Sequence, residues 1–226
     1  MEKKNLTEYL MLLRNSSVRY CNEEGHSNNE DSKDSTGVLQ VIDWDPILLW
    51  YLPNLCCIKD IEIMVRGVGL NSISSIGCGC GLLEWIITSL TGLKVTGYEV
   101  NKSWWNSPYA PPKFIPLVYV DADADADADA DANSEAIPFI PADHALLFCY
   151  FNDIVAFRKY LGNYKGDCLI IIGSLDGTRI TNPNPLELRG SHDWSLTLSH
   201  VKKNNDVICC YRRNKKLTSL TSKYKS

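Results

Sequence analysis

Three glycines at alternate positions, Gly77, Gly79 and Gly81, stand between an apolar run and a stretch with a helical pattern. Glycines let a ligand lie against backbone N–H groups, and a following helix would offer its positive N-terminal end. Glu99 comes 18 residues after Gly81, at the end of the next apolar run. A carboxylate there can accept hydrogen bonds from both hydroxyls of a ribose. This spacing favours a nucleotide site over a structural turn, for which we expect one glycine instead of three.

Two cysteines lie between these glycines, so the same stretch could bind a metal. Cys78 and Cys80 are separated by one residue instead of two, and no second pair of cysteines or histidines has zinc-site spacing. The nine cysteines fall mostly inside apolar runs, where cysteine is typically a small buried hydrophobic residue. We therefore expect no metal at the glycines. Aspartates in the repeat at 121–132 could bind a divalent cation only weakly, because a solvated loop gives them no fixed geometry.

The elements that would position these residues alternate between strand and helix. The apolar runs predict strands at 72–77, 94–100, 114–120, 144–151 and 167–173, with helices at 82–90 and 153–161. Nearly continuous apolar strands separated by helices indicate a parallel sheet that is covered on both faces. In such a sheet, the loop after the first strand and the end of the second strand lie at the same edge.

The ends of this pattern predict different connections. The apolar runs at 194–201 and 207–213 are separated by five residues, which is too short for a crossover helix. They must therefore pair as an antiparallel hairpin. Before the first strand, apolar residues at helical spacing between Pro46 and Gly69 predict two helices, and residues 5–14 predict a short helix of their own.

Length and composition indicate one globular domain, since 226 residues with 45% hydrophobic content can bury a single sizeable core. We expect a helix and a mobile polar segment at 1–40, the main domain at 41–214 with a low-complexity loop insertion at 121–135, and a basic tail at 215–226. The formal net charge of −4 is local, because the chain without the six aspartates of the repeat carries +2. Neither a long apolar run nor a signal-peptide core is present, so we expect a cytoplasmic protein without membrane association.

In these features the chain resembles the class I S-adenosylmethionine-dependent methyltransferases. The likeness is carried by "IGCGCG" at 76–81, by Glu99 and by "VICCYRR" at 207–213, and it covers residues 42–213. The chain is most similar to an uncharacterised branch, through "DHALLFCYF", "YKGDCLIIIG" and "ICCYRRN". The resemblance implies a Rossmann-like α/β fold with a seven-stranded, mostly parallel sheet and an antiparallel last strand. It also implies S-adenosyl-L-methionine as cofactor and an unknown methyl acceptor, either a small molecule or a protein.

The resemblance also implies the roles of the site residues. Residues 76–81 would face the methionine part of the cofactor, Glu99 the ribose and residues 121–122 the adenine, while residues 149–150 would lie near the acceptor. The cofactor-binding candidates are Ser75, Ile76, Gly77, Cys78, Gly79, Gly81, Glu99, Asp121, Ala122, Cys149 and Tyr150. The family usually has an acid where this chain has Ser75, whose hydroxyl cannot offset the cofactor's positive ammonium and sulfonium groups. We therefore expect a lowered affinity, which Ser75→Asp would restore.

No residue is assigned a catalytic role. The fourth strand lacks the Asn/Asp-Pro-Pro-Tyr segment that marks transfer to amide or base nitrogens in the wider superfamily. His192 beside Asp193 could form a base with its orienting partner, although such a pair is more often simply solvated. Trp104 and Trp105 could line an acceptor pocket or pack as core. The alternative function is a degenerate fold that acts as a binding or scaffold protein. The basic C-terminal end has no aromatic platform and does not predict nucleic-acid binding.

Overall fold

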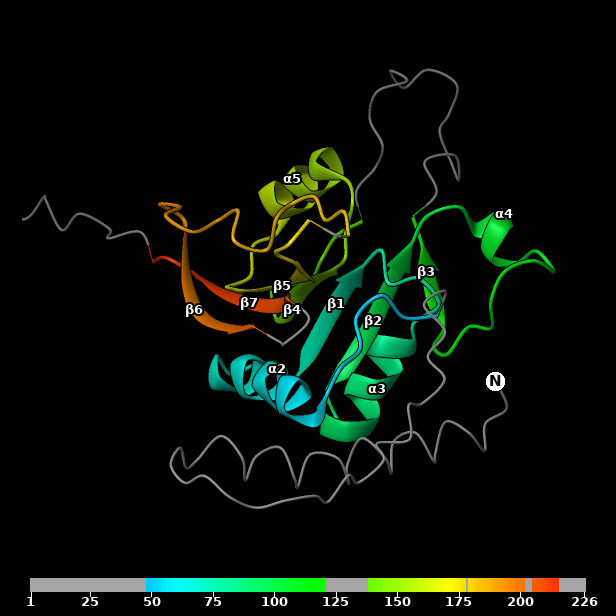
Figure 1. The fold of residues 1–226 in the computed structure, drawn as a ribbon, viewed down its shortest axis with the longest axis horizontal. Helices are drawn as coiled ribbons and strands as arrows, with labels where there is room; N and C mark the ends of the chain where they lie inside the picture. Colours follow the sequence, from blue (N-terminus) through cyan, green and yellow to red (C-terminus); the bar gives the residue numbers. More distant parts are fainter. Residues whose placement is uncertain (1–47, 121–137, 178, 202–204, 216–226) are drawn as a thin grey trace, which may run out of the picture.

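The computed structural model of the protein describes residues 48–120, 138–177, 179–201 and 205–215. Four helices and seven strands lie in these parts of the chain, and Figure 1 labels them. In chain order they are α2 (Leu55–Gly67), β1 (Ser72–Ile76), α3 (Leu82–Thr91), β2 (Lys94–Glu99), α4 (Lys102–Trp105), β3 (Leu117–Tyr119), β4 (His144–Cys149), α5 (Ile154–Asn163), β5 (Cys168–Ser174), β6 (Trp194–Val201) and β7 (Asp206–Arg213).

The seven strands form one sheet in the order β3-β2-β1-β4-β5-β7-β6. Strands β1 to β5 run parallel, whereas β7 is antiparallel to both β5 and β6. The predicted fold class, a mostly parallel sheet with an antiparallel last strand, is therefore confirmed. The chain builds outward from β1 in one direction and then continues from β4 in the other. In open α/β sheets such a reversal opens a crevice at the carboxyl ends of the two strands.

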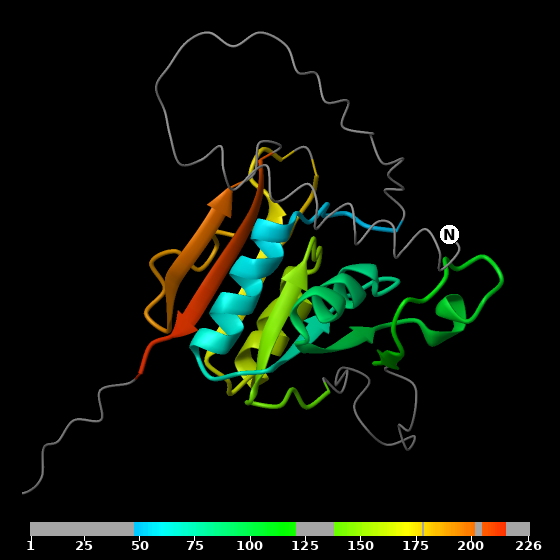
Figure 2. The same ribbon diagram turned by 90° about the horizontal axis from the view of Figure 1, so that it is seen from below.

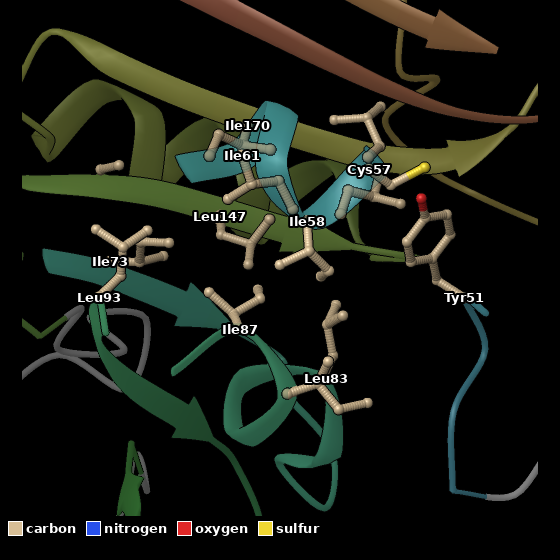
Figure 3. Packing of buried hydrophobic residues seen from close by; sticks show 14 of the residues in the cluster. Tyr51, Cys57, Ile58, Ile61, Ile73, Leu83, Ile87, Leu93, Leu147 and Ile170 are labelled. Atoms are coloured by element: carbon tan, nitrogen blue, oxygen red, sulfur yellow. The ribbon is translucent and has the colours of Figure 1, made fainter. Parts of the chain in front are cut away.

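Helices cover both faces of this sheet. Helices α2 and α3 lie on one face and α5 on the other, and the view from below shows the same layers (Figures 1 and 2). On the α2 face, Ile58 and Ile61 pack against Ile73 of β1, Leu147 of β4 and Ile170 of β5 (Figure 3). These side chains are fully buried, and each such burial contributes about 1.5–3 kcal/mol.

The prediction of two helices between Pro46 and Gly69 was wrong for the described part of that stretch. Residues 48–54 form turns and bends, and only α2 is helical. Pro53 explains the difference, because a proline disfavours helical backbone in the residue before it. Asn54 then starts α2 as its N-cap, since its side-chain oxygen accepts a hydrogen bond from the N–H of Cys57 at 2.8 Å.

Several sequence predictions concern residues outside the described ranges. These are the helix at 5–14, the polar segment that follows it, the repeat at 121–132 and the tail from 216 onward. Within the described ranges, no three metal-binding side chains come together and no disulfide joins two cysteines. None of the helices described is both long enough and apolar enough to span a membrane.

Candidate functional site

The glycine loop connects the carboxyl end of β1 to the start of α3. Gly77, Gly79 and Gly81 have φ angles of +66°, +62° and +78°, a region that favours glycine because it has no Cβ. The loop is held by a hydrogen bond from the N–H of Gly77 to the carbonyl of Tyr98 at 2.9 Å. Our expectation that a structural turn would need only one glycine was therefore wrong, since the path of the backbone alone requires all three.

The atoms around each of the three glycines show whether an added side chain would meet the protein or open space. A Cβ added at Gly77 would lie 3.0 Å from Cδ2 of Phe151, and one added at Gly81 would lie 3.0 Å from Cδ1 of Ile115. A Cβ added at Gly79 would meet no atom within 4 Å. The protein's own side chains thus account for Gly77 and Gly81. Of the three glycines of the loop, only Gly79 has open space where a side chain would stand.

Glu99, the last residue of β2, lies directly beside this loop. Its Oε1 accepts a hydrogen bond from the N–H of Gly79 at 2.7 Å, and its Oε2 accepts one from the N–H of Val100 at 2.9 Å. Partial burial raises the pKa of the carboxyl group, while these two N–H groups and the Trp105 side chain lower it. Three of the four lone pairs of this carboxylate are therefore used, and one can still accept a hydrogen bond from a ligand. The structure brings Glu99 and Gly79 together, and their role in binding a cofactor stays a prediction.

Glu84, in the first turn of α3, is a candidate that the sequence analysis missed. Its Oε1 accepts a hydrogen bond from the Ser75 hydroxyl at 2.6 Å, and its side chain is buried, with the residue 1% exposed. Its Oε2 is also buried and has no hydrogen-bond partner in the described part of the chain. The signal was a single acid in the apolar stretch "GLLEWII". The acid that position 75 lacks is thus present beside it, on another element.

Burial dominates the electrostatics around Glu84. It raises the pKa of this carboxyl group from 4.5 to about 7, although the Ser75 hydroxyl and the N–H of Glu84 itself lower it. The nearby charge of Glu99 raises it further. Burial and the charge of Glu84 also raise the pKa values of the Cys78 and Cys149 thiols. Both cysteines therefore stay protonated near neutral pH, and neither is an activated nucleophile.

A second cluster lies at the carboxyl ends of β4 and β5. The hydroxyl of Tyr150 donates a hydrogen bond to the buried carboxylate of Asp206. Burial raises the pKa of the Tyr150 hydroxyl. The guanidinium carbon of Arg179 lies 5.3 Å from the centre of the Tyr150 ring. The ring of Trp50, a largely exposed residue, lies 6.2 Å away. Tyr150 is a poor general base here, because its hydroxyl is a committed donor.

Ile76 and residues 121–122 are the other predicted cofactor-binding positions. Ile76 packs in the core on the α5 face, so only its backbone can face the loop. Residues 121–122 lie outside the described ranges.

His192 and Asp193 do not belong to this site. Asn214 donates hydrogen bonds to the main-chain carbonyls of both, through its side chain and its N–H respectively. The next residue, Arg213, donates its N–H to the carbonyl of Asp167, just before the amino end of β5. The glycine loop is at the opposite edge of the sheet. The structure therefore places this pair at the other end of the strands from the glycine loop.

The tryptophan pair of α4 divides its roles. The two rings contact edge to face, with their centres 4.7 Å apart. Trp105 packs against the core and its side chain hydrogen-bonds Glu99, whereas Trp104 is 45% exposed. Trp105 thus contacts both the core and Glu99, and it helps to hold the Glu99 side chain in place.

Solved structures with a similar fold include methyltransferases. An O-methyltransferase from Bacillus cereus in complex with S-adenosylhomocysteine is 14% identical, with 78% of this chain and 94% of that chain covered and a TM-score of 0.43. A candidate O-methyltransferase from Klebsiella pneumoniae is 13% identical, with 77% and 93% covered and a TM-score of 0.45. Human N-acetylserotonin methyltransferase in complex with S-adenosylmethionine is 13% identical, with 70% and 50% covered and a TM-score of 0.42. These likenesses concern the fold alone. No family model and no curated protein sequence matches the chain.

Proposed function

We propose that this protein binds S-adenosylmethionine at the glycine loop and transfers its methyl group to an acceptor, either a small molecule or a protein. The observation that carries the proposal is the open space at Gly79, directly beside the Glu99 carboxylate. Gly79 follows β1, which is one of the two strands between which the order of the sheet reverses, and Glu99 ends the neighbouring strand β2. The carboxyl ends of strands at such a reversal are the expected ligand site of an open α/β sheet.

The residues present fit the chemical groups of this cofactor. The bare backbone at Gly79 leaves room for a close approach, and the one lone pair that Glu99 does not use can accept a hydrogen bond from a ribose hydroxyl. Glu84 is a buried acid below the same loop, with one oxygen that lacks a partner among the described residues. A cationic ligand would offset the burial of that charge.

When bound, S-adenosylmethionine supplies a methyl group on a positively charged sulfur that is already activated for displacement. The chain then has to bind the cofactor and the acceptor, orient them and exclude water. A dedicated base is optional. Glu99 and the loop at Gly79 would hold the nucleoside end. Tyr150, at the end of β4, would border the acceptor, with Trp50 and Arg179 beside it. Asp206 fixes the Tyr150 hydroxyl, so the aromatic ring is oriented and the hydroxyl does not take the acceptor's proton.

The alternative function is a scaffold that keeps the fold without the reaction, and the absence of a recognisable acceptor motif favours it. Isothermal titration calorimetry of the full chain with S-adenosylmethionine and S-adenosylhomocysteine separates the two proposals. We expect saturable binding of both ligands to the wild type. Well-folded protein that binds neither would overturn the methyltransferase proposal and leave the scaffold.

A further inference from the structure

Glu84 is the buried charged group of the described chain that packing explains least. It lies among apolar neighbours, since Leu82, Leu83, Ile86 and Ile87 of the same helix are all buried. Burying a carboxylate is costly unless it is paired, and a leucine of similar size would pack there without that penalty. The hydrogen bond from Ser75 satisfies Oε1 only. Oε2 is buried and has no hydrogen-bond partner in the parts of the chain that the structure describes.

Helix capping does not account for this carboxylate. The N-cap of α3 is Gly81, which has left-handed backbone and no side chain with which to cap the helix. The stabilisation that a first-turn acid gains from the helix dipole at the surface is smaller than the cost of burying its charge. The position is instead explained by what lies above it. Cys78 of the glycine loop, Glu99 of β2 and Cys149 of β4 are titratable groups that lie close enough to interact with Glu84.

None of these neighbours is cationic. When it is ionised, the carboxylate is thus a negative charge near the loop for which the described residues supply no positive partner. We propose that Glu84 is the counter-charge for the α-ammonium group of the bound cofactor, with Ser75 as its positioning residue. The inference rests on the proposed function. An ammonium group carries three N–H donors, which match an unpartnered carboxylate oxygen, whereas a sulfonium has no donor. The acid that the motif lacks at position 75 is supplied from α3.

Three ligands separate this role from others. S-Adenosylhomocysteine carries the ammonium without a sulfonium, methylthioadenosine carries neither charge, and S-adenosylmethionine carries both. Calorimetric titration of the full chain should show that Glu84→Gln weakens S-adenosylhomocysteine about 10- to 100-fold, as for a lost hydrogen bond between charged groups. Methylthioadenosine should bind the variant as it binds the wild type.

The dependence of binding on pH gives a second readout that a merely structural role would not move. Because the pKa of Glu84 is about 7, its charge should form between about pH 6 and 8, and α-amino groups lose their proton mainly toward the upper end of this interval. Wild-type affinity for S-adenosylhomocysteine should rise across this interval. Glu99 faces the same loop and has a raised pKa too, but its effect would appear equally with methylthioadenosine. The ratio of the two affinities therefore isolates Glu84.

Ser75→Ala tests the role of the positioning residue. It also provides a second test of the proposal if Glu84→Gln does not fold. Loss of the Ser75 hydrogen bond removes an interaction that lowers the pKa of Glu84, so the midpoint of the affinity ratio should move to higher pH. Thermal melting followed by circular dichroism checks that each variant is folded.

The possible results have separate meanings. An affinity ratio that Glu84→Gln leaves unchanged, or that is independent of pH in the wild type, would overturn the counter-charge. A loss confined to S-adenosylmethionine would assign Glu84 to the sulfonium and overturn the ammonium role. Wild-type protein that binds none of the three ligands would overturn the proposed function itself.

Discussion

The N–H of Gly79 donates a hydrogen bond to Oε1 of Glu99 at 2.7 Å, although the two residues are 20 positions apart in the chain. The carboxylate thus orders the part of the loop that borders open space. The sequence predicts that this strand-end acid contacts a ribose, and the structure adds its direct hydrogen bond to the loop. One group therefore shapes the loop and remains able to accept hydrogen bonds from a ligand.

Glu99→Ala should weaken binding of S-adenosylmethionine by roughly 1.5–3 kcal/mol, because it removes a charged acceptor. It should also lower the free energy of unfolding by about 1 kcal/mol, since the N–H of Gly79 loses its partner. Calorimetry measures the first effect and urea unfolding the second. Glu99→Gln is the matched control, and it should retain part of the loop geometry. An unchanged affinity for Glu99→Ala would remove Glu99 from the site.

Gly79→Val should abolish cofactor binding while the protein still folds. The added side chain would enter the open space at a φ of +62°, and the strained backbone should cost about 1–3 kcal/mol. Gly92→Val is the matched control, because Gly92 has a φ of +73° and also has nothing within 4 Å of an added Cβ, but it ends α3. The two variants should melt at similar temperatures, and only Gly79→Val should lose binding in calorimetry. Equal binding by both would show that the space at Gly79 is not the cofactor site.

Ser75→Asp should destabilise the protein instead of restoring affinity. The Ser75 hydroxyl lies 2.6 Å from Oε1 of Glu84, so a second carboxylate would meet the first inside the core. Two buried like charges at that distance cannot both ionise, so one must stay protonated. We expect a lowered melting temperature and weaker binding at neutral pH. The double variant Ser75→Asp with Glu84→Ser should recover much of both losses, and tighter binding by Ser75→Asp alone would contradict our assignment of the acid to α3.

Glu84 should make the protein less stable as the pH rises. Its pKa is about 7 in the folded chain and 4.5 ordinarily, so the folded state binds more protons than the unfolded state between these values. The free energy of unfolding should therefore fall by at most about 3 kcal/mol from about pH 4.5 to about pH 7. Urea unfolding across this range measures the slope.

Glu84→Gln is the control for that slope. Most of the dependence on pH should disappear in the variant, and a weaker slope should remain because burial also raises the pKa of Glu99. A wild-type slope equal to that of the variant would contradict the raised pKa of Glu84. Saturating S-adenosylhomocysteine should restore much of the stability that wild-type protein loses near neutral pH.

The fold class and most of the strands and helices follow from the pattern of residues along the chain. Apolar strands separated by helices predict a parallel sheet, and the five-residue connection before 207–213 forces the hairpin that makes β7 antiparallel. These features follow from local hydrophobic period and from connection length, both of which can be counted along the chain. The proximity of Glu99 to the glycine loop follows from the same logic, since the ends of neighbouring parallel strands meet at one edge.

Which residues at that end of the strands share an environment depends on how distant elements pack together. The hydrogen bond between Ser75 and Glu84 joins a strand to a helix. Burial raises the pKa of the Glu84 carboxyl group, and no spacing in the sequence indicates that burial. The exclusion of His192 and Asp193 depends on the strand order, because only the sheet shows which edge they occupy. Position along the chain sets the ends of the elements, whereas burial and charge at a site depend on atoms that distant elements bring together.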